Sequence, residues 1–337
     1  MISTLPARAQ SPSQPLVTQA VNEASLVPLP GNTRAEARDP ANDRGIVPDS
    51  MALPHMLLQL RRPAAQDQAL NALIDQLHDA QSPNYHRWLS PAEVGAQFGP
   101  AASDIAVITG WLTQHGFAVN SVYPNGMVID FSGTAGQVRN TFHTEIHNLS
   151  VNGVAHFANM SDPQIPTALA PAVVGIVSLH DFRPRPGAAR NPAAPLPSSQ
   201  PNYTSGGNYW VTPADLATIY NFNPVFSGGN TGQGQTIYLI EDSDLYTSTD
   251  WTTFRTGFGI PVSSYPGASL TTVHPGGCTD PGANGDGGEA SLDAEYASAA
   301  APSAAIVMAT CAGTASTGGW VIAIENLLTA ARPPSSA

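Results

Sequence analysis

Hydrophobic positions between residues 51 and 182 switch repeatedly between the period of a strand and that of a helix. The apolar run at 55–61 predicts a strand, and apolar residues one turn apart predict a helix at 63–80. Further helical patterns cover residues 90–98 and 103–116. The mixture predicts a small α+β domain over 51–182, in which helices accompany an antiparallel sheet.

Cap and turn signals mark the ends of these elements. Ser90 and Glu93 form a predicted capping box, Thr134 and Gln137 form another, and Ser103 is the predicted cap of the helix at 103–116. Tight-turn sequences that predict hairpins lie at Pro124-Asn125-Gly126 and Asn152-Gly153.

The pattern changes beyond residue 208. Continuous apolar runs at 234–242 and 304–311 predict strands that are buried on both faces. Helical patterns cover residues 250–258, 289–300 and 318–331. This order predicts the start of an α/β domain with a parallel sheet over 209–337. So few strands make an incomplete sheet, and we expect the natural protein to continue beyond Ala337.

Two segments lack periodicity. Residues 1–50 are polar and proline-rich and are predicted to be disordered or extended. They include Ala7-Arg8-Ala9, a small-x-small pattern that would fit the end of a signal peptide. Residues 183–208 begin with a stretch rich in Pro, Ala and Ser and predict an exposed linker that proteases can cut.

Charge is scarce in the chain of 337 residues. Only 11% of residues are charged, the formal net charge is −12, and all 13 basic residues are arginine. Such a surface depends little on ion pairs and would tolerate acid. An acidic chain without a basic patch argues against nucleic acid as a partner, and no apolar run is long enough to span a membrane. Cys278 and Cys311 could form one disulfide or remain two unpaired residues.

Glu289 and Asp293 lie four residues apart in the predicted helix at 289–300, where like charges repel. No Lys or Arg lies between Arg255 and Arg332 to neutralise them. If buried, the two carboxyl groups could share a proton, with one group kept ionised as a general base. Such a base would still work in acid, where a histidine would be protonated. The pair could then serve a hydroxyl nucleophile.

Interpretations without a catalytic role also stay open for this acidic region. Acidic residues on an alanine-rich helix usually form a solvated face, and this is the prediction for Glu295. The Asp/Asn/Gly-rich residues 280–289 could suggest a calcium loop, but Gly282 and Ser291 occupy positions that need ligands in an EF-hand. We therefore expect a flexible loop that leads into the helix. His274 is predicted to be an isolated loop residue without a role.

Several stretches together resemble the sedolisin family of serine-carboxyl peptidases, which includes the kumamolisin-like enzymes. "YHRWLSPAEVGAQFGP", "VIDFSGTAGQVRNTFHTEIH" and "VVGIVSLHDF" resemble its activation prodomain, and "YWVTPADLATIYN" resembles the start of its mature enzyme. "GEASLDAEYASAAAP" resembles the helix that bears the catalytic acids. The resemblance covers about residues 50–331 in the family's order.

The resemblance implies roles for individual residues. Glu289 would be the general base toward a serine, and Asp293 would orient Glu289 and share its proton. The family's Ser-Gly-Thr-Ser nucleophile, its oxyanion Asp and its C-terminal Ca²⁺ site would all come later than residue 337. "SGTS" occurs nowhere in the chain, and Ser132-Gly133-Thr134 lies in the predicted prodomain, where Thr134 has a capping role. We therefore predict no catalytic role for Ser132.

The resemblance implies a secreted zymogen of an acid-acting serine endopeptidase with protein or peptide substrates. Residues 51–182 would be the activation prodomain, residues 183–208 the processing linker, and residues 209–337 part of a subtilisin-like catalytic domain. The prodomain would contact the catalytic domain within the same molecule. The 337-residue chain itself is predicted to be inactive, because a general base alone forms no acyl-enzyme. The alternatives are a prodomain-type inhibitor or folding chaperone for a related protease, and an extracellular structural protein.

Overall fold

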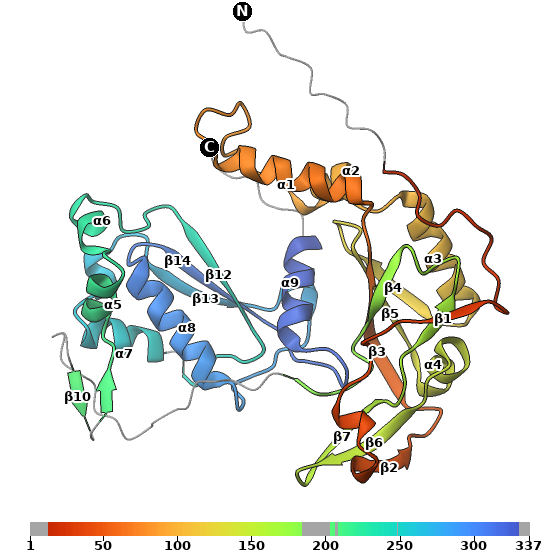
Figure 1. Ribbon diagram of the computed structural model, residues 1–337. Coiled ribbons are helices and arrows are strands. Elements are labelled where there is room, and N and C mark those ends of the chain that lie inside the picture. The colour runs from red at the N-terminus through yellow and green to blue at the C-terminus, as the bar shows by residue number, and fades with distance from the viewer. Residues whose placement is uncertain (1–12, 184–202, 206–207, 248, 330–337) are drawn as a thin grey trace, which may run out of the picture. The chain divides into compact units, whose positions relative to one another are not determined.

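The computed structural model describes residues 13–183, 203–205, 208–247 and 249–329 (Figure 1). The chain divides into two compact units: the first holds residues up to Phe182 together with 315–317, and the second holds the remainder from Arg183 onward. Among the described residues, no helix combines the length and apolarity that a membrane crossing requires.

The first unit is built on antiparallel sheets. Its largest sheet has the strand order β4-β5-β3-β9, formed by Ala118–Val122, Val128–Thr134, Ala52–Leu60 and Val173–Val177. A second sheet has the order β2-β6-β7, formed by Asp43–Ile46, Ile146–Val151 and Val154–Asn159. Strand β1 (Leu26–Pro28) pairs with β8 (Gln164–Pro166). The predicted antiparallel α+β arrangement is confirmed for this unit.

Both predicted hairpins are present because their turn residues adopt the backbone that a tight turn requires. Asn152 and Gly153 both have positive φ, at 53° and 81°, and they join β6 to β7. This is the signature of an Asn-Gly turn, which matches the twist of paired strands. A longer loop, residues 123–127, joins β4 to β5, and its Gly126 has a positive φ of 72° whereas Asn125 does not.

Four helices accompany these sheets: α1 (Ala64–His78), α2 (Pro91–Phe98), α3 (Ala102–Gln114) and α4 (Ala135–Phe142). The capping boxes predicted at Ser90 and Thr134 are both formed. The predicted cap at Ser103 is wrong: α3 begins at Ala102, so Ser103 lies inside the first turn, and Ala101 occupies the N-cap without a side-chain bond.

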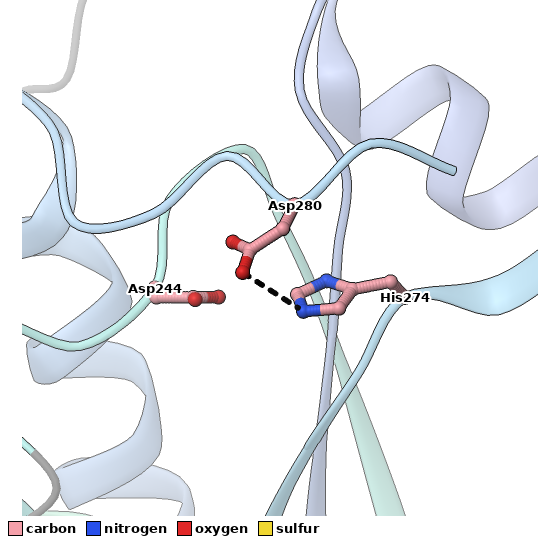
Figure 2. A group of neighbouring side chains, drawn as sticks. All are labelled: Asp244, His274 and Asp280. Carbon is pink, nitrogen blue, oxygen red and sulfur yellow. Dashed lines mark ion pairs between the residues drawn. The ribbon is translucent and has the colours of Figure 1, made fainter. Parts of the chain in front are cut away.

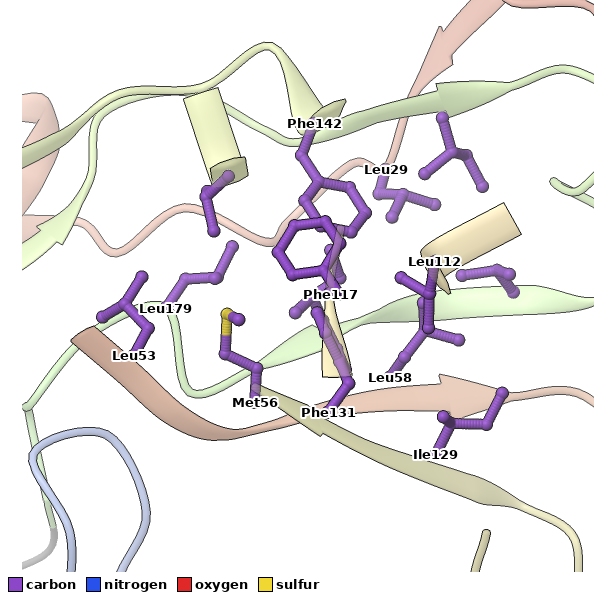
Figure 3. Packing of buried hydrophobic residues seen from close by; sticks show 14 of the residues in the cluster. Leu29, Leu53, Met56, Leu58, Leu112, Phe117, Ile129, Phe131, Phe142 and Leu179 are labelled. Atoms are coloured by element: carbon purple, nitrogen blue, oxygen red, sulfur yellow. The ribbon is translucent and has the colours of Figure 1, made fainter. Parts of the chain in front are cut away.

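Aromatic rings fill the centre of the first unit (Figure 3). The Phe117 and Phe131 rings meet edge to face at a centroid distance of 5.2 Å, and Phe142 lies within 5.6 Å of Phe117. Such ring pairs add about 0.5–1.5 kcal/mol beyond the burial of their area. This core joins β5 to α4 and to the end of α3, segments that the sequence separates.

Residues 1–50 were predicted to be disordered or extended, and residues 13–50 follow the second alternative: they are mostly irregular, with the short strands β1 and β2. Residues 1–12, including the predicted cleavage pattern, lie outside the described part. Leu29 and Val47 are buried in the core, and Leu16 and Val17 pack against it. The buried carboxylate of Asp104 accepts backbone hydrogen bonds from Leu16 (2.7 Å) and Val17 (3.1 Å). Contacts with residues more than eighty positions away thus hold in place a segment whose own composition predicts no fixed structure.

The second unit contains a parallel sheet with the strand order β12-β14-β13. Its strands are β12 (Thr236–Glu241), β13 (Ser269–Val273) and β14 (Ala305–Thr310). Its helices are α5 (Pro213–Ile219), α6 (Asn223–Ser227), α7 (Asp250–Gly257), α8 (Gly287–Ala300) and α9 (Gly319–Thr329). The predicted parallel α/β arrangement is confirmed, except that the mostly polar β13 was not predicted. Short 3₁₀ turns occur at 36–38, 40–42, 262–264 and 275–277.

Burial within this sheet differs from the prediction for β12. Strand β14 lies between two neighbours, and Ile306 and Met308 are fully buried. Strand β12 lies at an edge, where Tyr238 is 51% exposed. Most of the predicted linker lies outside the described residues; within it, β10 (Tyr203–Ser205) pairs with β11 (Asn208–Trp210).

Alanines bring α8 close to the sheet. Ala290 and Ala294 are fully buried and pack with Met308 of β14 and Trp251 of α7. Small side chains on this face leave little space between the helix and the strands. The alanine-rich composition of the segment therefore has a packing role, and it fixes the height of the acidic side chains above the sheet.

We expect the bonds at Asp104 to hold the N-terminal segment in place. Asp104→Ala should lower the free energy of unfolding by about 1.5–3 kcal/mol, because hydrogen bonds to a buried charged group are lost. Limited proteolysis should also cut residues 13–25 faster. The matched control is Asp75→Ala, at an exposed position of α1. Equal stability and equal cleavage in both variants would contradict this role of Asp104.

Candidate functional site

Helix α8 positions both acids that the sequence singles out. It begins at Gly287, where an added Cβ would meet the Tyr246 ring at 3.0 Å, so this glycine allows a close approach of the helix start. Glu289 lies in the first turn, where a negative charge is favourable to the helix dipole. Glu289 is half-buried, whereas Asp293, one turn later, is exposed.

A third carboxyl group, which the sequence analysis missed, completes this cluster. Glu241 is the last residue of β12 and is 8% exposed. A hydrogen bond joins its carboxyl group to that of Asp293. Burial first, and then this bond and the negative charges of Asp293 and Glu289, raise the pKa of Glu241 to about 8. At acid and neutral pH, Glu241 is therefore protonated and donates to Asp293.

A second pair of carboxyl groups lies beside the first. Asp242 follows Glu241 in sequence, and Asp286 is the N-cap residue of α8. Burial, and then repulsion by Asp286, raise the pKa of Asp242, and the two side chains are hydrogen-bonded. The end of β12 thus meets the first turns of α8 through paired acids. Such pairs hold together only while they share protons.

The structure gives Asp293 a partner other than the predicted one. The sequence analysis predicts a proton shared by Glu289 and Asp293, whereas the hydrogen bond described for the Asp293 carboxyl group comes from Glu241. Glu289 contributes its charge to the same cluster. The catalytic roles of Glu289 and Asp293 stay predictions. Glu241 could have been found as an acid that ends an apolar strand, because ligands gather at the carboxyl ends of parallel strands.

Glu295 was predicted to lie on a solvated face, and this is wrong. Its side chain is partly buried, and burial, followed by the charge of Asp250, raises its pKa to about 7. Burial arises because α7, which carries Asp250, packs against α8.

Ser132 has a structural environment in the first unit. Its hydroxyl oxygen lies 3.2 Å from the backbone N–H of His55 and 2.8 Å from the amide of Asn120, and it accepts from both. These bonds connect β3, β4 and β5, to which the three residues belong. This supports the prediction that Ser132 is not a nucleophile.

Cys278 and Cys311 form a disulfide with a Cα–Cα distance of 5.7 Å. Of the two alternatives left open by the sequence, the structure has the bonded one. The bridge ties the loop that precedes α8 to the residue that follows β14.

Comparisons with known proteins identify similar chains. A family model described as the pro-kumamolisin activation domain matches residues 41–182. Xanthomonalisin from Xanthomonas sp. (strain T-22) is 28% identical over 255 residues, which cover 71% of this chain and 28% of that protein. Sedolisin from Pseudomonas sp. (strain 101) is 25% identical over 69% of this chain and 38% of its own length. Kumamolisin from Bacillus sp. (strain MN-32) is 26% identical, with coverages of 83% and 49%. The chain thus spans less than half the length of each of these relatives.

We expect the second unit to lose stability as the pH rises from about 4.5 to about 8. Glu241 and Glu295 have folded-state pKa values of about 8 and about 7, above their ordinary value of 4.5. Within that window the folded state binds protons that the unfolded state has released, so the free energy of unfolding falls as the pH rises.

Urea unfolding at about pH 5 and about pH 8 tests this. The loss of stability between the two conditions should be smaller by at least about 1 kcal/mol in the double variant Glu241→Gln, Glu295→Gln. Asp75→Asn, at an exposed position of the first unit, is the control and should retain the wild-type loss. An unchanged loss in the double variant would show that these two groups titrate normally.

Proposed function

We propose that this chain, which belongs to the sedolisin family of serine-carboxyl peptidases, represents the N-terminal part of a secreted, acid-acting endopeptidase zymogen. The first unit would be its activation prodomain, and the second unit the first portion of a subtilisin-like catalytic domain. The observation that carries the proposal is the proton-sharing carboxyl cluster at the carboxyl end of a parallel strand, beside the helix that bears Glu289. The match of the activation-domain model to residues 41–182 supports the assignment of the first unit.

Glu289 would act as the general base in this mechanism. It would take the hydroxyl proton of a serine while the serine oxygen attacks the carbonyl carbon of a peptide bond. The same proton would then pass to the leaving amine, which leaves an acyl-enzyme that water hydrolyses. This serine would come from outside the 337 residues, because "SGTS" does not occur in them. The family's oxyanion Asp and Ca²⁺ site would likewise lie outside them.

Glu241 and Asp293 would prepare Glu289 for this task. Because the pKa of Glu241 is raised to about 8, its carboxyl group carries a proton at acid pH and can donate it in the bond to Asp293. The bond fixes Asp293 to the end of β12, and Asp293, one turn after Glu289 on α8, would orient the base. A histidine base would be protonated in the same conditions. The cluster therefore suits a peptidase that works in acid.

Several carboxylates of the first unit have lowered pKa values, whereas those of Glu241 and Glu295 in the second unit are raised. Hydrogen bonds from Arg34 lower the pKa of Glu36, and those from Arg139 lower the pKa of Asp49. Groups with a lowered folded-state pKa stabilise the fold above their ordinary pKa, and this contribution is lost as the pH falls through the lowered value. Acid would thus weaken the first unit while it favours the protonated pairs of the second. We propose this contrast as the trigger for release of the prodomain by cutting within residues 183–208.

Processing of a longer natural protein should test both the base and the trigger. We expect cleavage within residues 183–208 to be faster at about pH 3 than at about pH 5, since the pKa values of Glu36 and Asp49 are lowered from 4.5 and 3.8 and protonation weakens their pairs only below these values. Glu289→Gln should slow cleavage at least about 10³-fold, because a triad member is lost. Asp293→Asn and Glu241→Gln should slow it less. The measurement is the rate of appearance of the two fragments on denaturing gels.

The matched control is Asp75→Asn, at an exposed position of α1 in the first unit. The 337-residue chain should show no cleavage at any pH, since it supplies no serine motif. Processing that is fastest near neutral pH, or that survives Glu289→Gln, would contradict the proposal.

A second candidate function is inhibition or chaperoning of a related protease. Two observations favour it. The activation-domain model matches residues 41–182, and the chain spans less than half the length of each relative, so the activation domain makes up a large share of this chain. We expect the 337-residue chain with Glu289→Gln to inhibit the mature form of a sedolisin relative at about pH 5 if this candidate holds. The measurement is casein hydrolysis against added chain. A relative that keeps its full rate at a large molar excess of the chain would exclude the candidate.

A further inference from the structure

Two aspartates and one histidine gather at the carboxyl edge of the parallel sheet in the second unit (Figure 2). Asp244 lies three residues after the end of β12, His274 directly follows β13, and Asp280 lies in the loop between β13 and α8. One donor atom of each residue lies within 4.8 Å of the others. Nε2 of His274 is 3.6 Å from Oδ2 of Asp280. The prediction that His274 is an isolated loop residue is therefore wrong.

The backbone fixes which ring nitrogen of His274 faces the two aspartates. Nδ1 lies 3.1 Å from the carbonyl oxygen of Thr310, which can only accept, so Nδ1 carries the hydrogen. In the neutral ring Nε2 then has a lone pair, and Figure 2 shows this nitrogen directed at Asp280. A histidine that donates one ring N–H to a backbone carbonyl and presents the other nitrogen to anionic oxygens has the arrangement of a metal ligand.

Thr310 also orients the second ligand. Its hydroxyl donates to Oδ1 of Asp244 at 2.7 Å. Thr310 is the fully buried last residue of β14, so it holds Asp244 and His274 from the interior of the sheet. The disulfide from Cys278 to Cys311 fixes the loop between His274 and Asp280 to the residue after Thr310. The fold thus holds two of the three side chains from within, while Asp280 is 61% exposed and its Oδ1 accepts from the backbone N–H of Gly282 at 2.7 Å, which leaves Oδ2 facing His274.

We propose that Asp244, His274 and Asp280 bind one divalent transition-metal ion of the Zn²⁺ class. One imidazole nitrogen and two carboxylate oxygens match the preference of Zn²⁺ for nitrogen and oxygen ligands, whereas Ca²⁺ and Mg²⁺ prefer oxygen alone. Bonds of about 2.1 Å would place tetrahedral ligands about 3.4 Å apart. A small movement of the exposed loop that carries Asp280 would close the remaining distance, with Oδ1 still bonded to Gly282. Water would complete the coordination.

The proposed ion would brace the loop that leads into α8. Its ligands come from the residues that follow β12 and β13, and its supporting threonine ends β14, so it would join the carboxyl ends of all three strands. This role is separate from peptide hydrolysis and does not depend on the proposed enzyme function.

Zinc binding by the 337-residue chain, with its disulfide intact, tests the proposal. At about pH 7, equilibrium dialysis with metal analysis should give one tightly bound Zn²⁺ per chain. His274→Gln and Asp280→Asn should each remove it, whereas the control His143→Gln, at an exposed histidine of the first unit, should retain it. Thr310→Val should weaken binding about 10–100-fold, because it removes the hydroxyl that orients Asp244. Co²⁺ bound in place of Zn²⁺ should give a visible absorption spectrum that His274→Gln abolishes.

Three results would overturn the proposal. The first is that the wild-type chain retains no Zn²⁺, which would leave His274 and the aspartates as an ion pair alone. The second is that His274→Gln, shown by its melting curve to be folded, retains Zn²⁺ as the wild type does. The third is that the chain retains Ca²⁺ in preference to Zn²⁺, which would exclude an ion that needs the imidazole.

Discussion

The second unit depends on one electrostatic constraint: among its described residues, cations near the buried carboxyl groups are scarce, and Arg183 acts on Asp242 but not on Glu241 or Glu295. Between Arg255 and Arg332 the chain has no Lys or Arg, and the guanidinium of Arg255 itself is buried and directed to the carbonyl oxygens of Ser298 and Pro302. A buried carboxyl group in such surroundings is stable only when it is protonated or accepts a proton from a neighbour. The pairs Glu241–Asp293 and Asp242–Asp286 satisfy this condition. The scarcity of nearby cations thus explains both why the carboxyl groups pair with one another and why these pairs need bound protons.

The first unit meets a different condition. Its pairs consist of an acid with an arginine or a histidine, such as Asp49 with Arg139 and Asp43 with His147. Such ion pairs favour ionised carboxylates, so protonation of the acid removes an attraction in the first unit. In the second unit, protonation instead allows two carboxyl groups to form a hydrogen bond. The placement of the few arginines of this chain therefore decides how each unit responds to acid.

Local signals predicted much of the fold. The capping boxes at Ser90 and Thr134 and the Asn152-Gly153 turn require only neighbouring residues, and all three are present. Segments that depend on distant partners were not predicted. Residues 13–50 are ordered through Asp104 and the core, and β13 forms because it pairs with β14. Glu289 and Asp293 could be found from their spacing. The place of Glu241 at the end of an apolar strand could have marked it as a candidate, but not its bond to Asp293, which lies on a helix more than forty residues away.

The alanines of α8 have a consequence for acidity. Ala290 and Ala294 set the distance between the helix and the sheet, and the helix carries Asp293 toward Glu241 at the end of β12. A bulkier side chain at either alanine would lift the helix and stretch the carboxyl–carboxyl contact. The proton affinity of Glu241 would then change although no ionisable group had been altered. In this unit, the size of the side chains between helix and sheet therefore influences the pKa of a carboxyl group.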